Sequence, residues 1–494
     1  MLGKPSKQRD FFDSYIYENL LPTEHILLDI KQKIDFSFVE EETKGLYSSQ
    51  LGRPSYPPEV LFKMLFLEFY YNLSDVEVAK QCKYNILYRY FTGLQIHEPT
   101  PDDTSLVVFR DRLGQEKFSR IFDQIVLQAK ENGLLKERLK IVDSTKVIAD
   151  VLMPNKVNLL HQGRKLITKA ISKINPQKAQ ELAKKYLRRT KLFTRPTEKE
   201  IEKERRLTRQ FIKDIKTKFN KNIDNLSSLL NSASLGRKKK DKLASFIDPD
   251  ARFGKTKIGP EGNFCGYKAH ISEDESEIIT SVDTLKGNKD EGSNLKPLLE
   301  MDKEKQIIHK ATVADAKYDS AKNRRYIHRK NMRAYIPSGR GSKKYIDNFS
   351  YDKTTGTVIC QEGHSPLSKT RQENGYLYIF STKSCKHCKD KPAACPKPNA
   401  GRIRLFISDD HKLKLLDNIP ERKEAITLRK GIERKFGEAK KWHGMSRARY
   451  RTKRKVAIQI LMTFLVINAK RITRLLKERS PARVFQPALA IRAG

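Results

Sequence analysis

The chain has few acidic residues for its size. Its 494 residues contain 59 Asp and Glu against 99 Lys and Arg, a formal net charge of +40. So large an excess is costly in self-repulsion and indicates a polyanionic partner, with nucleic acid favoured over an anionic membrane surface. Because 38% of the residues are hydrophobic, with 19 Tyr and 23 Phe, a disordered basic polymer is excluded.

Long hydrophobic runs are also missing. Residues 1–15, MLGKPSKQRDFFDSY, lack the apolar run of a secretion signal. The most apolar stretch, residues 456–469, is too short to cross a bilayer and contains Gln459, Thr463 and Asn468, so we expect a buried helix. Six cysteines in so long a basic chain do not indicate a secreted disulfide scaffold. We expect a cytoplasmic protein, associated with the nucleoid and with no membrane.

Residues 1–135 are expected to form a helical domain. Pro57 and Pro58 precede a broadly apolar segment, as at a helix start. Ser74 and Glu77 have the spacing of a capping box, and further helices are expected after Thr104. Short helices joined by tight turns make up helix-turn-helix DNA-binding modules and small helical bundles alike, so periodicity leaves both alternatives open.

Residues 156–245 are rich in Lys, Arg and Glu and nearly free of Gly. Their apolar residues recur at helical spacing in two stripes, separated by Pro196. This pattern predicts a long helical hairpin inserted into the surrounding domain. The hairpin is either a solvated spacer or a basic arm that lies on DNA or on a second subunit, and residues 236–242, GRKKKDK, are its most basic patch.

The flanking segments, residues 136–155 and 246–339, are strand-rich. Their order of strand, hairpin, helix, strand, helix, strand is typical of a mixed α/β sheet covered by helices. Residues 340–410 contain short strands and turns rich in Gly and Ser, which predict a small β-rich insertion. Residues 411–480 return to a helical pattern, and residues 481–494 are expected to form a loose basic tail.

Three carboxylates stand out in this pattern. Asp143 and Asp315 each follow an apolar strand-like segment, so each is expected at the end of a buried strand. Glu433 lies in segment 428–442, LRKGIERKFGEAKKW, which as one helix places it on the same face as Arg429 and Lys440. Such a face suits a site that holds a metal ion and contacts phosphate.

Cleavage and rejoining of DNA requires this kind of carboxylate set. Carboxylates from separate elements hold two divalent ions about 3.5–4 Å apart, one activating the attacking oxygen and one stabilising the leaving oxygen. Oxygen ligands favour Mg²⁺ or Mn²⁺ over zinc. Two aspartates at strand ends and a glutamate on a helix are the arrangement of RNase H-like nucleases.

The motifs around these residues resemble the DDE transposases of bacterial insertion sequences. VDST around Asp143, VADAKYDS around Asp315 and the Arg-x3-Glu-x6-Lys spacing around Glu433 are similar to the three catalytic blocks of that family. DPDARFG and GYKAH are similar to the family between the first two blocks. In residues 52–113, GRPSYPPEVLFKMLF, LSDVEVAKQCKYN, RYFTGL and PDDTSLVVFRDRL resemble the N-terminal domain of such transposases, which implies a DNA-end-binding or dimer-forming domain.

The resemblance implies an RNase H-like catalytic domain that cleaves element ends and transfers the 3′-hydroxyl to target DNA. Its metal ligands would be Asp143, Asp315 and Glu433, and its contacts to the end phosphates would be Arg429 and Lys440. Because two double-stranded ends must be paired, we expect a homodimer on DNA. Two alternatives remain open: a metal-dependent site-specific nuclease without transposition, and a DNA-binding protein derived from a transposase.

The sequence also departs from the family pattern and contains rival carboxylates. The family has a Tyr three residues before the Arg of the third block, where this chain has Ile426. The stacking or phosphate contact of that tyrosine is therefore in doubt, while the carboxylate triad is not. The rivals for the metal-binding roles are Asp150, Asp283, Asp290 and Glu438.

Four of the six cysteines cluster in the β-rich insertion. Cys385 and Cys388 have the C-x2-C spacing of a metal knuckle, and Cys360 and Cys395 can complete a tetrahedral zinc site with four thiolate ligands. His364 or His387 is an alternative fourth ligand, and reduced thiols or a disulfide are the alternatives to zinc. Bound metal would stabilise a region with so little core. Cys82 and Cys265 are expected to be core residues.

A basic segment follows the third block. Residues 447–455, RARYRTKRK, contain six cations and no acidic residue. We expect Arg447, Arg449 and Arg451 to contact DNA phosphates. Trp442, the only tryptophan, is expected to pack in the core, with stacking on a displaced base as the alternative.

Overall fold

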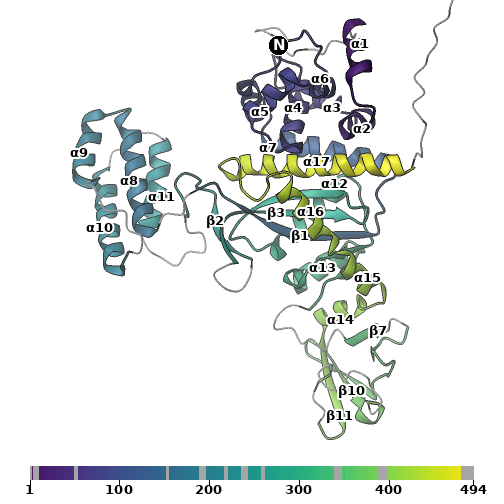
Figure 1. Cartoon of the computed structure of the whole chain (residues 1–494). Coiled ribbons are helices and arrows are strands. Elements are labelled where there is room, and N and C mark those ends of the chain that lie inside the picture. The colour runs from purple at the N-terminus through teal and green to yellow at the C-terminus, as the bar shows by residue number, and fades with distance from the viewer. Residues whose placement is uncertain are drawn as a thin grey trace, which may run out of the picture.

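The computed structural model describes residues 3, 11–48, 54–151, 155–187, 196–215, 221–234, 243–256, 262–338, 348–352, 354–385, 395–396 and 399–479. Figure 1 shows the N-terminal helices on one side of the long helix α17 and the central sheet on the other. A separate helical group and a β-rich group extend from the sheet in different directions. The basic segments 236–242 and 481–494 lie outside the described residues.

The N-terminal region is helical, as the sequence predicts, and α4 is its central helix. All residues of α4 from Val60 to Phe69 are buried, because neighbouring helices cover it on every side. The helices of this region are α1 (Phe11–Leu20), α2 (Ile26–Lys33), α3 (Phe38–Lys44), α4 (Pro58–Tyr70), α5 (Asp75–Tyr84), α6 (Ile86–Thr92) and α7 (Asp103–Glu131).

The expected helix boundaries in this region are largely confirmed. Pro58 is the first residue of α4, and Ser74 and Glu77 form a complete capping box at the start of α5. The N-cap of α7 is Asp102, two residues before the Thr104 that we expected. Gly114 bends α7 in the middle with φ 64° and ψ 172°, a conformation that only glycine adopts readily.

The central sheet is mixed, with the strand order and helix layers of an RNase H-like fold. β3 pairs antiparallel with β1 on one side and with β2 and β4 on the other, while β1, β5 and β6 are parallel neighbours. The strands are β1 (Leu139–Ile148), β2 (Arg252–Lys255), β3 (Asn263–Asp274), β4 (Ile279–Lys286), β5 (Ala311–Val313) and β6 (Arg333–Tyr335).

Helices cover both faces of this sheet, and successive strand residues alternate between the two layers. Ile141 and Val313 belong to the large core shared with α7 and α17 (Lys453–Arg479). Val142 and Ala314 belong to a second core, shared with α12 (Leu295–Glu304) and α13 (Ala321–Arg329).

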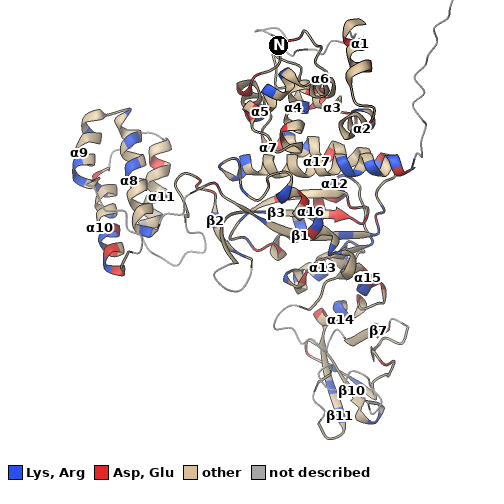
Figure 2. Cartoon of the chain, viewed as in Figure 1, with Lys and Arg blue, Asp and Glu red and all other residues tan. Residues whose placement is uncertain are grey.

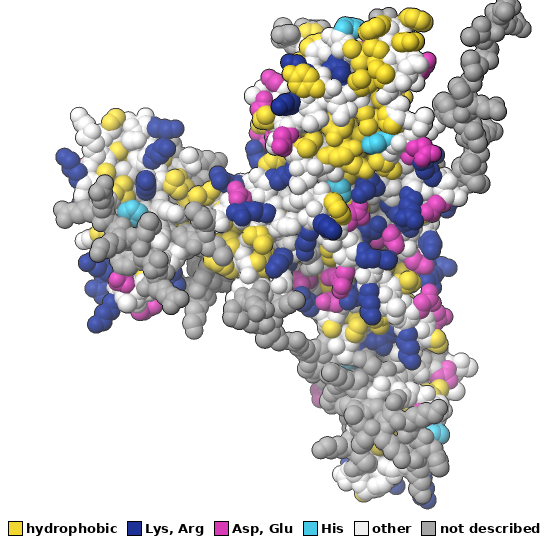
Figure 3. All heavy atoms as spheres, in the orientation of Figure 1, with side chains coloured by type: hydrophobic (Ala, Val, Ile, Leu, Met, Phe, Trp, Pro, Cys, Tyr) yellow, Lys and Arg dark blue, Asp and Glu magenta, His cyan; other side chains and the backbone are white. Residues whose placement is uncertain are grey.

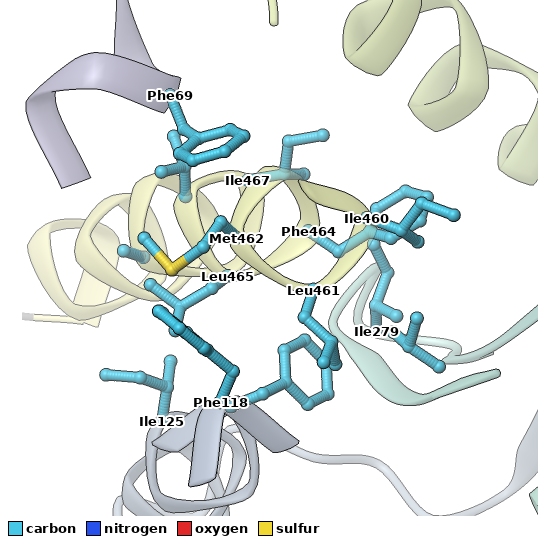
Figure 4. Close-up of a cluster of buried hydrophobic side chains, with 14 of the residues drawn as sticks. Phe69, Phe118, Ile125, Ile279, Ile460, Leu461, Met462, Phe464, Leu465 and Ile467 are labelled. Atoms are coloured by element: carbon cyan, nitrogen blue, oxygen red, sulfur yellow. The ribbon is translucent and has the colours of Figure 1, made fainter. Parts of the chain in front are cut away.

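Helix α17 joins the N-terminal helices to the sheet. Figure 4 shows its apolar side chains between Phe69 of α4, Phe118 and Ile125 of α7, and Ile279 of β4. Figure 2 shows that its charged residues lie toward its two ends. By length and composition α17 could cross a membrane, but 89% of its apolar window is buried inside the protein, which is the buried helix that the sequence predicts.

Two buried amide side chains of this helix, those of Asn468 and Gln459, are hydrogen-bonded within the protein. Asn468 binds both the N–H and the C=O of Ile279 in β4, at 2.9 and 2.7 Å. Gln459 accepts from the Arg449 N–H and donates to the Arg447 C=O. These bonds attach α17 to the sheet and to the basic segment, because a buried amide without partners would be costly.

The inserted segment between β1 and β2 is helical but is not the long hairpin that we expected. It contains α8 (Lys156–Ser172), α9 (Pro176–Tyr186), α10 (Glu198–Asp214) and α11 (Lys221–Ser234). These helices pack around a core of their own, and fully buried Arg164 bonds Thr208 and Glu204 within it. Apolar residues have the same helical spacing in one long helix and in two shorter helices that fold back on each other. The sequence pattern therefore did not distinguish a long hairpin from a group of shorter helices.

Among the described residues between β6 and α17, the chain forms two small sheets and the helices α14, α15 and α16. β7 (Phe349–Asp352) pairs with β8 (Thr357–Cys360), and β10 (Gly375–Ser381) pairs with β9 (Ser368–Gln372) and β11 (Arg402–Ser408). They share a compact core with Leu415 of α14 (Asp409–Leu416). The chain then enters α15 (Glu421–Leu428) and α16 (Gly431–Lys441), which lead back to the central sheet.

Candidate active site

Asp143 and Asp315 lie side by side at the end of the parallel strand pair β1 and β5. Ile141 of β1 is opposite Val313 of β5, and each aspartate follows one of these two residues by two positions. Neighbouring strands are about 4.8 Å apart, and the second residue along a strand returns to the same face. The two carboxylates therefore belong to adjacent backbone segments, and the Asp143 side chain lies on the same face of the sheet as Ile141, the side that carries α17.

The local settings of the two aspartates differ. β1 continues through Asp143 to Ile148 in its pairing with β3, so our expectation of a strand end at Asp143 was wrong. Asp315 does follow a strand end, and its Oδ1 accepts a 2.9 Å hydrogen bond from the Lys317 N–H. Asp143 is a strand residue because β3 pairs with β1 well beyond the short strand β5.

Asp143 is the more perturbed carboxylate. Its side chain is 18% exposed and forms a 2.8 Å ion pair with Arg429. The pKa of Asp143 is raised to about 6, chiefly by burial, and the charge of Asp315 acts in the same direction. The Ser144 N–H, Arg429 and Lys317 oppose this shift. A buried carboxylate with a raised pKa beside a second carboxylate is a suitable binding place for a cation.

The third block forms two helical segments where we expected one helix. α15 ends at Leu428 and α16 begins at Gly431, with Arg429 and Lys430 at the junction. Bonds from Ile432 N–H to Arg429 C=O and from Glu433 N–H to Lys430 C=O tighten this turn. Arg429 and Lys430 keep helical dihedral angles at the junction. The spacing of side chains in the sequence is therefore that of a continuous helix and does not predict the junction.

Arg429 and Lys440 both reach β1, and Glu433 lies between them along the chain. Arg429 contacts Asp143, and the Lys440 Nζ donates to the Thr145 hydroxyl. Glu433 is exposed, and its side chain has no hydrogen bond or ion pair with any residue that the structure describes. Because seven residues are close to two helical turns, Glu433 and Lys440 share one face of α16.

The carboxylates suit a hard divalent ion in their chemistry. Asp143 and Asp315 supply oxygen ligands from adjacent strands, and Glu433 offers a third from the helix that contacts β1. Among the described residues, however, no three metal-binding side chains are gathered closely enough to hold an ion together. Asp143 is paired with Arg429.

The structure gives three of the rival carboxylates other partners. Asp150 is paired with Arg447, and Asp290 accepts from the Ser293 N–H and hydroxyl at 2.8 Å. Glu438 is paired with Lys470. Asp283 lies on β4 opposite His270 of β3.

The basic segment is divided between surface and interior. Arg447 and Arg451 have side chains 64% and 54% exposed, and both lie near Asp150. Arg449 is only 19% exposed and pairs with buried Glu68 of α4 at 3.1 Å. We therefore leave Arg449 out of the candidate DNA surface.

Glu68 is the centre of a buried network that the sequence analysis missed. Arg110 of α7 pairs with Glu68 and with Asp75, and the Tyr450 hydroxyl donates to Glu68 at 3.3 Å. The pKa of Glu68 is raised to about 7, chiefly by burial and then by the charge of Asp75. With Arg449, the network ties the N-terminal helices to the basic segment. No spacing in the sequence relates residues so far apart.

Two residues of the second block were also missed, although the motif VADAKYDS contains them. Lys317 has a half-exposed side chain that pairs with Glu291. Tyr318 is fully buried and shares a 3.0 Å hydrogen bond with His270 Nε2. Burial raises the pKa of Tyr318 well above its usual range, and the charge of Asp143 is the next cause. The tyrosine therefore stays neutral beneath the aspartates.

The cysteine cluster is described only in part. Cys360 and Cys395 line one small cavity together with His364, and both pack against the core of the β-rich insertion. Cys385 is the last residue of a short 3-10 helix, but its side chain is not among the described parts of the chain. Cys388 and His387 also lie outside the described residues. Cys82 and Cys265 are buried core residues as expected.

Trp442 is 60% exposed, so the expectation that it packs in the core was wrong. It follows the last residue of α16 as the C-cap, where the helix meets solvent. The Lys441 ammonium lies over its ring at 4.8 Å. An exposed indole beside a cation remains available to stack on a base.

Two family matches cover most of the chain. Residues 15–112 match the family described as transposase domain (DUF772). Residues 213–469, just over half of the chain, match the family described as transposase DDE domain. No curated protein matches the chain.

Proposed function

The chain belongs to the transposase DDE domain family, and from this premise we propose that it cuts insertion-element ends and joins them to target DNA. Asp143, Asp315 and Glu433 are the proposed catalytic carboxylates. The observation that carries this assignment is the β1–β5 register, which brings Asp143 and Asp315 together from sequence positions 172 residues apart.

Each proposed residue has a distinct task. Asp143 and Asp315 would hold Mg²⁺ or Mn²⁺, and Glu433 would complete the ligand set from α16. When bound, the metal would activate the attacking oxygen and stabilise the leaving oxygen. We propose that Arg429 exchanges Asp143 for a DNA phosphate, because a guanidinium binds phosphate in two-point geometry. Lys440 then holds a second phosphate from the other end of α16.

Double-stranded element ends and target DNA are the proposed partners. The net charge of +40 supports a polyanionic ligand, and Figure 3 shows Lys and Arg side chains spread over much of the visible face. Arg447 and Arg451 add exposed cations beyond α16. We propose that the N-terminal helices bind element ends or pair two copies in a homodimer, and that the protein acts in the cytoplasm on nucleoid DNA.

Substitution of the carboxylates tests the assignment. Asp143→Asn, Asp315→Asn and Glu433→Gln should each abolish cutting of a labelled duplex that carries the element end with Mg²⁺. Binding of the same duplex without metal should persist. Glu131→Gln, a matched control at an exposed glutamate at the end of α7, should still cut.

The products of the same assay separate the alternatives. Joining of the cut end to a second DNA supports transposition, whereas cutting without joining indicates a nuclease. DNA binding without any cutting by the unsubstituted protein indicates a DNA-binding derivative. Normal strand transfer by any one of the three carboxylate variants would remove that residue from the site.

A further inference from the structure

Two adjoining cavities lie next to the candidate active site, and lysines line both. The smaller one, of about 480 Å³, runs along β1 past Ser144 and Thr145 and is bordered by Lys146 and Lys440. The larger one, of about 750 Å³, extends toward β2. Lys268, Glu291 and Lys317 line both cavities, so the two adjoin at these residues, and together we call them the lysine groove.

A buried glutamate positions two lysines at the centre of this groove. The Lys317 Nζ lies 2.8 Å from Glu291 Oε1, and the Lys268 Nζ lies 2.5 Å from Oε2. Glu291 is only 4% exposed, while half of the Lys317 side chain is exposed. Two ammonium groups on one carboxylate leave one positive charge in excess, and Lys317 carries it at the surface.

The interaction with Glu291 does not use the full binding capacity of Lys317. An ammonium group has three donors, and the structure describes one acceptor for Lys317 Nζ, which is Glu291. Lys268 is buried and donates to both Glu291 and the Lys289 carbonyl. Because Lys268 alone can neutralise Glu291, the charge of Glu291 does not account for a second, half-exposed lysine, which also interacts electrostatically with Asp315 and Asp143.

The position of Lys317 relative to the aspartates suggests its ligand. The backbone N–H of Lys317 donates to the carboxylate of Asp315. The Lys317 side chain lines the same cavity as Lys440 of α16. The aspartates thus lie close to cations from two separate elements, the segment after β5 and α16. A phosphodiester strand carries one negative charge per nucleotide, so a row of cations beside the cutting site suits successive phosphates.

We propose that Lys317, held by Glu291, is a positioning residue that binds a phosphate of the cut strand beside Asp143 and Asp315. The lysine groove is then the path of that strand away from the cut bond. This inference rests on the proposed function and adds a contact that Arg429 and Lys440 do not provide.

Salt-dependent DNA binding tests the contact without any cutting. With the full-length protein and an element-end duplex in metal-free buffer, Lys317→Ala should weaken binding roughly tenfold. The slope of log K against log salt should become shallower by about 0.7–0.9, the value for one lost phosphate contact. Lys317→Arg should restore most of the affinity. Lys322→Ala removes an exposed lysine of α13 and should leave both quantities unchanged.

A phosphate scan locates the contact. Uncharged methylphosphonates are placed one at a time on either side of the cut position, and binding is measured with the unsubstituted protein and with Lys317→Ala. One position should weaken binding of the unsubstituted protein but not of Lys317→Ala, because the variant has already lost that contact. The same sensitivity in both proteins at every position would overturn the proposal.

The outcomes separate this inference from the proposed function. If the unsubstituted protein cuts and joins DNA but Lys317→Ala binds with the same affinity and salt slope, the lysine contact is wrong and the function stands. If the scan identifies the contact while the unsubstituted protein never cuts DNA, the contact stands and the catalytic function is wrong.

Discussion

At the scale of single residues, burial and charged partners together determine which carboxylates ionise easily. Glu273 of β3 is 2% exposed, and its Oε2 has no hydrogen-bond partner among the described residues. The pKa of Glu273 is raised to about 7, chiefly by burial, although the charge of Lys435 opposes the shift. Glu291 is about as buried but is held by two lysines, and its pKa is lowered to about 2. Partners, more than burial alone, decide the charge.

Glu273 should make stability depend on pH. Because its pKa is higher in the folded protein than in the unfolded chain, folding takes up a proton between about pH 4.5 and 7. The stabilisation contributed by Glu273 is therefore full below about pH 4.5. It declines as the pH rises and is lost once the pH has passed about 7. The change should be roughly 3 kcal/mol. Glu68, whose pKa is also raised to about 7, contributes a decline over the same range, so Glu273→Gln should reduce the decline by about 3 kcal/mol in urea unfolding measured across that range.

A matched variant gives the control for this pH effect. Glu131 is an exposed glutamate at the end of α7, so Glu131→Gln should keep the pH profile of the unsubstituted protein. An unchanged profile in Glu273→Gln would show that another group causes the decline.

At the scale of elements, the main features of the site follow from strand pairing and from the α15–α16 junction. The β1–β5 register aligns two aspartates, and α16 lies against β1 through Lys440 and Thr145. The β-rich insertion has only a small core of its own. A metal ion would add stability to such a region, so the proposed zinc site belongs to this scale.

Zinc in the insertion is directly measurable. Protein purified without chelator should contain close to one zinc per chain, and Cys360→Ser or Cys395→Ser should lower that content. Loss of zinc should also lower the unfolding temperature of the insertion, because metal binding and folding are coupled there. Cys265→Ser, in the sheet core, should keep the zinc. Absence of zinc from the carefully prepared unsubstituted protein would exclude the site.

At the scale of the whole molecule, α17 and the Glu68 network connect the N-terminal helices to the catalytic sheet. α17 is buried between them (Figure 4). Glu68, Arg110 and Arg449 add a set of charges whose members come from α4, α7 and the basic segment. Two of the arginines that the sequence assigned to DNA therefore have different roles: Arg451 is exposed, and Arg449 holds the two parts together.

Substitution should distinguish these two arginines. Arg449→Met leaves Glu68 buried with one cation fewer and should lower the free energy of unfolding by roughly 3 kcal/mol. Arg451→Met should change stability by less than about 0.5 kcal/mol but should weaken DNA binding and make its salt dependence shallower. Urea unfolding and DNA titration at several salt concentrations measure both. Equal stability of the two variants would contradict the connecting role of Arg449.

Sequence reasoning reached those features that rest on local chemistry. Apolar periodicity and the order of strand-like and helical segments predicted the mixed α/β fold, the helical N-terminal region and the buried helix at residues 456–469. The capping box at Ser74 was also predicted correctly. Each of these depends on residues close together in the chain, where side-chain spacing reflects the backbone period directly.

Only the tertiary structure decided the features that depend on distant residues. It divided the expected hairpin into a four-helix group, directed Arg449 inward, exposed Trp442 and placed Lys317 on Glu291. It also paired Arg429 with Asp143 and left Glu433 exposed. Such contacts depend on which surfaces meet after folding, and no spacing in the chain encodes the meeting of residues that are tens to hundreds of positions apart. The sequence by itself therefore determined the fold class and the candidate side chains for the chemistry, and packing decided how those side chains are arranged.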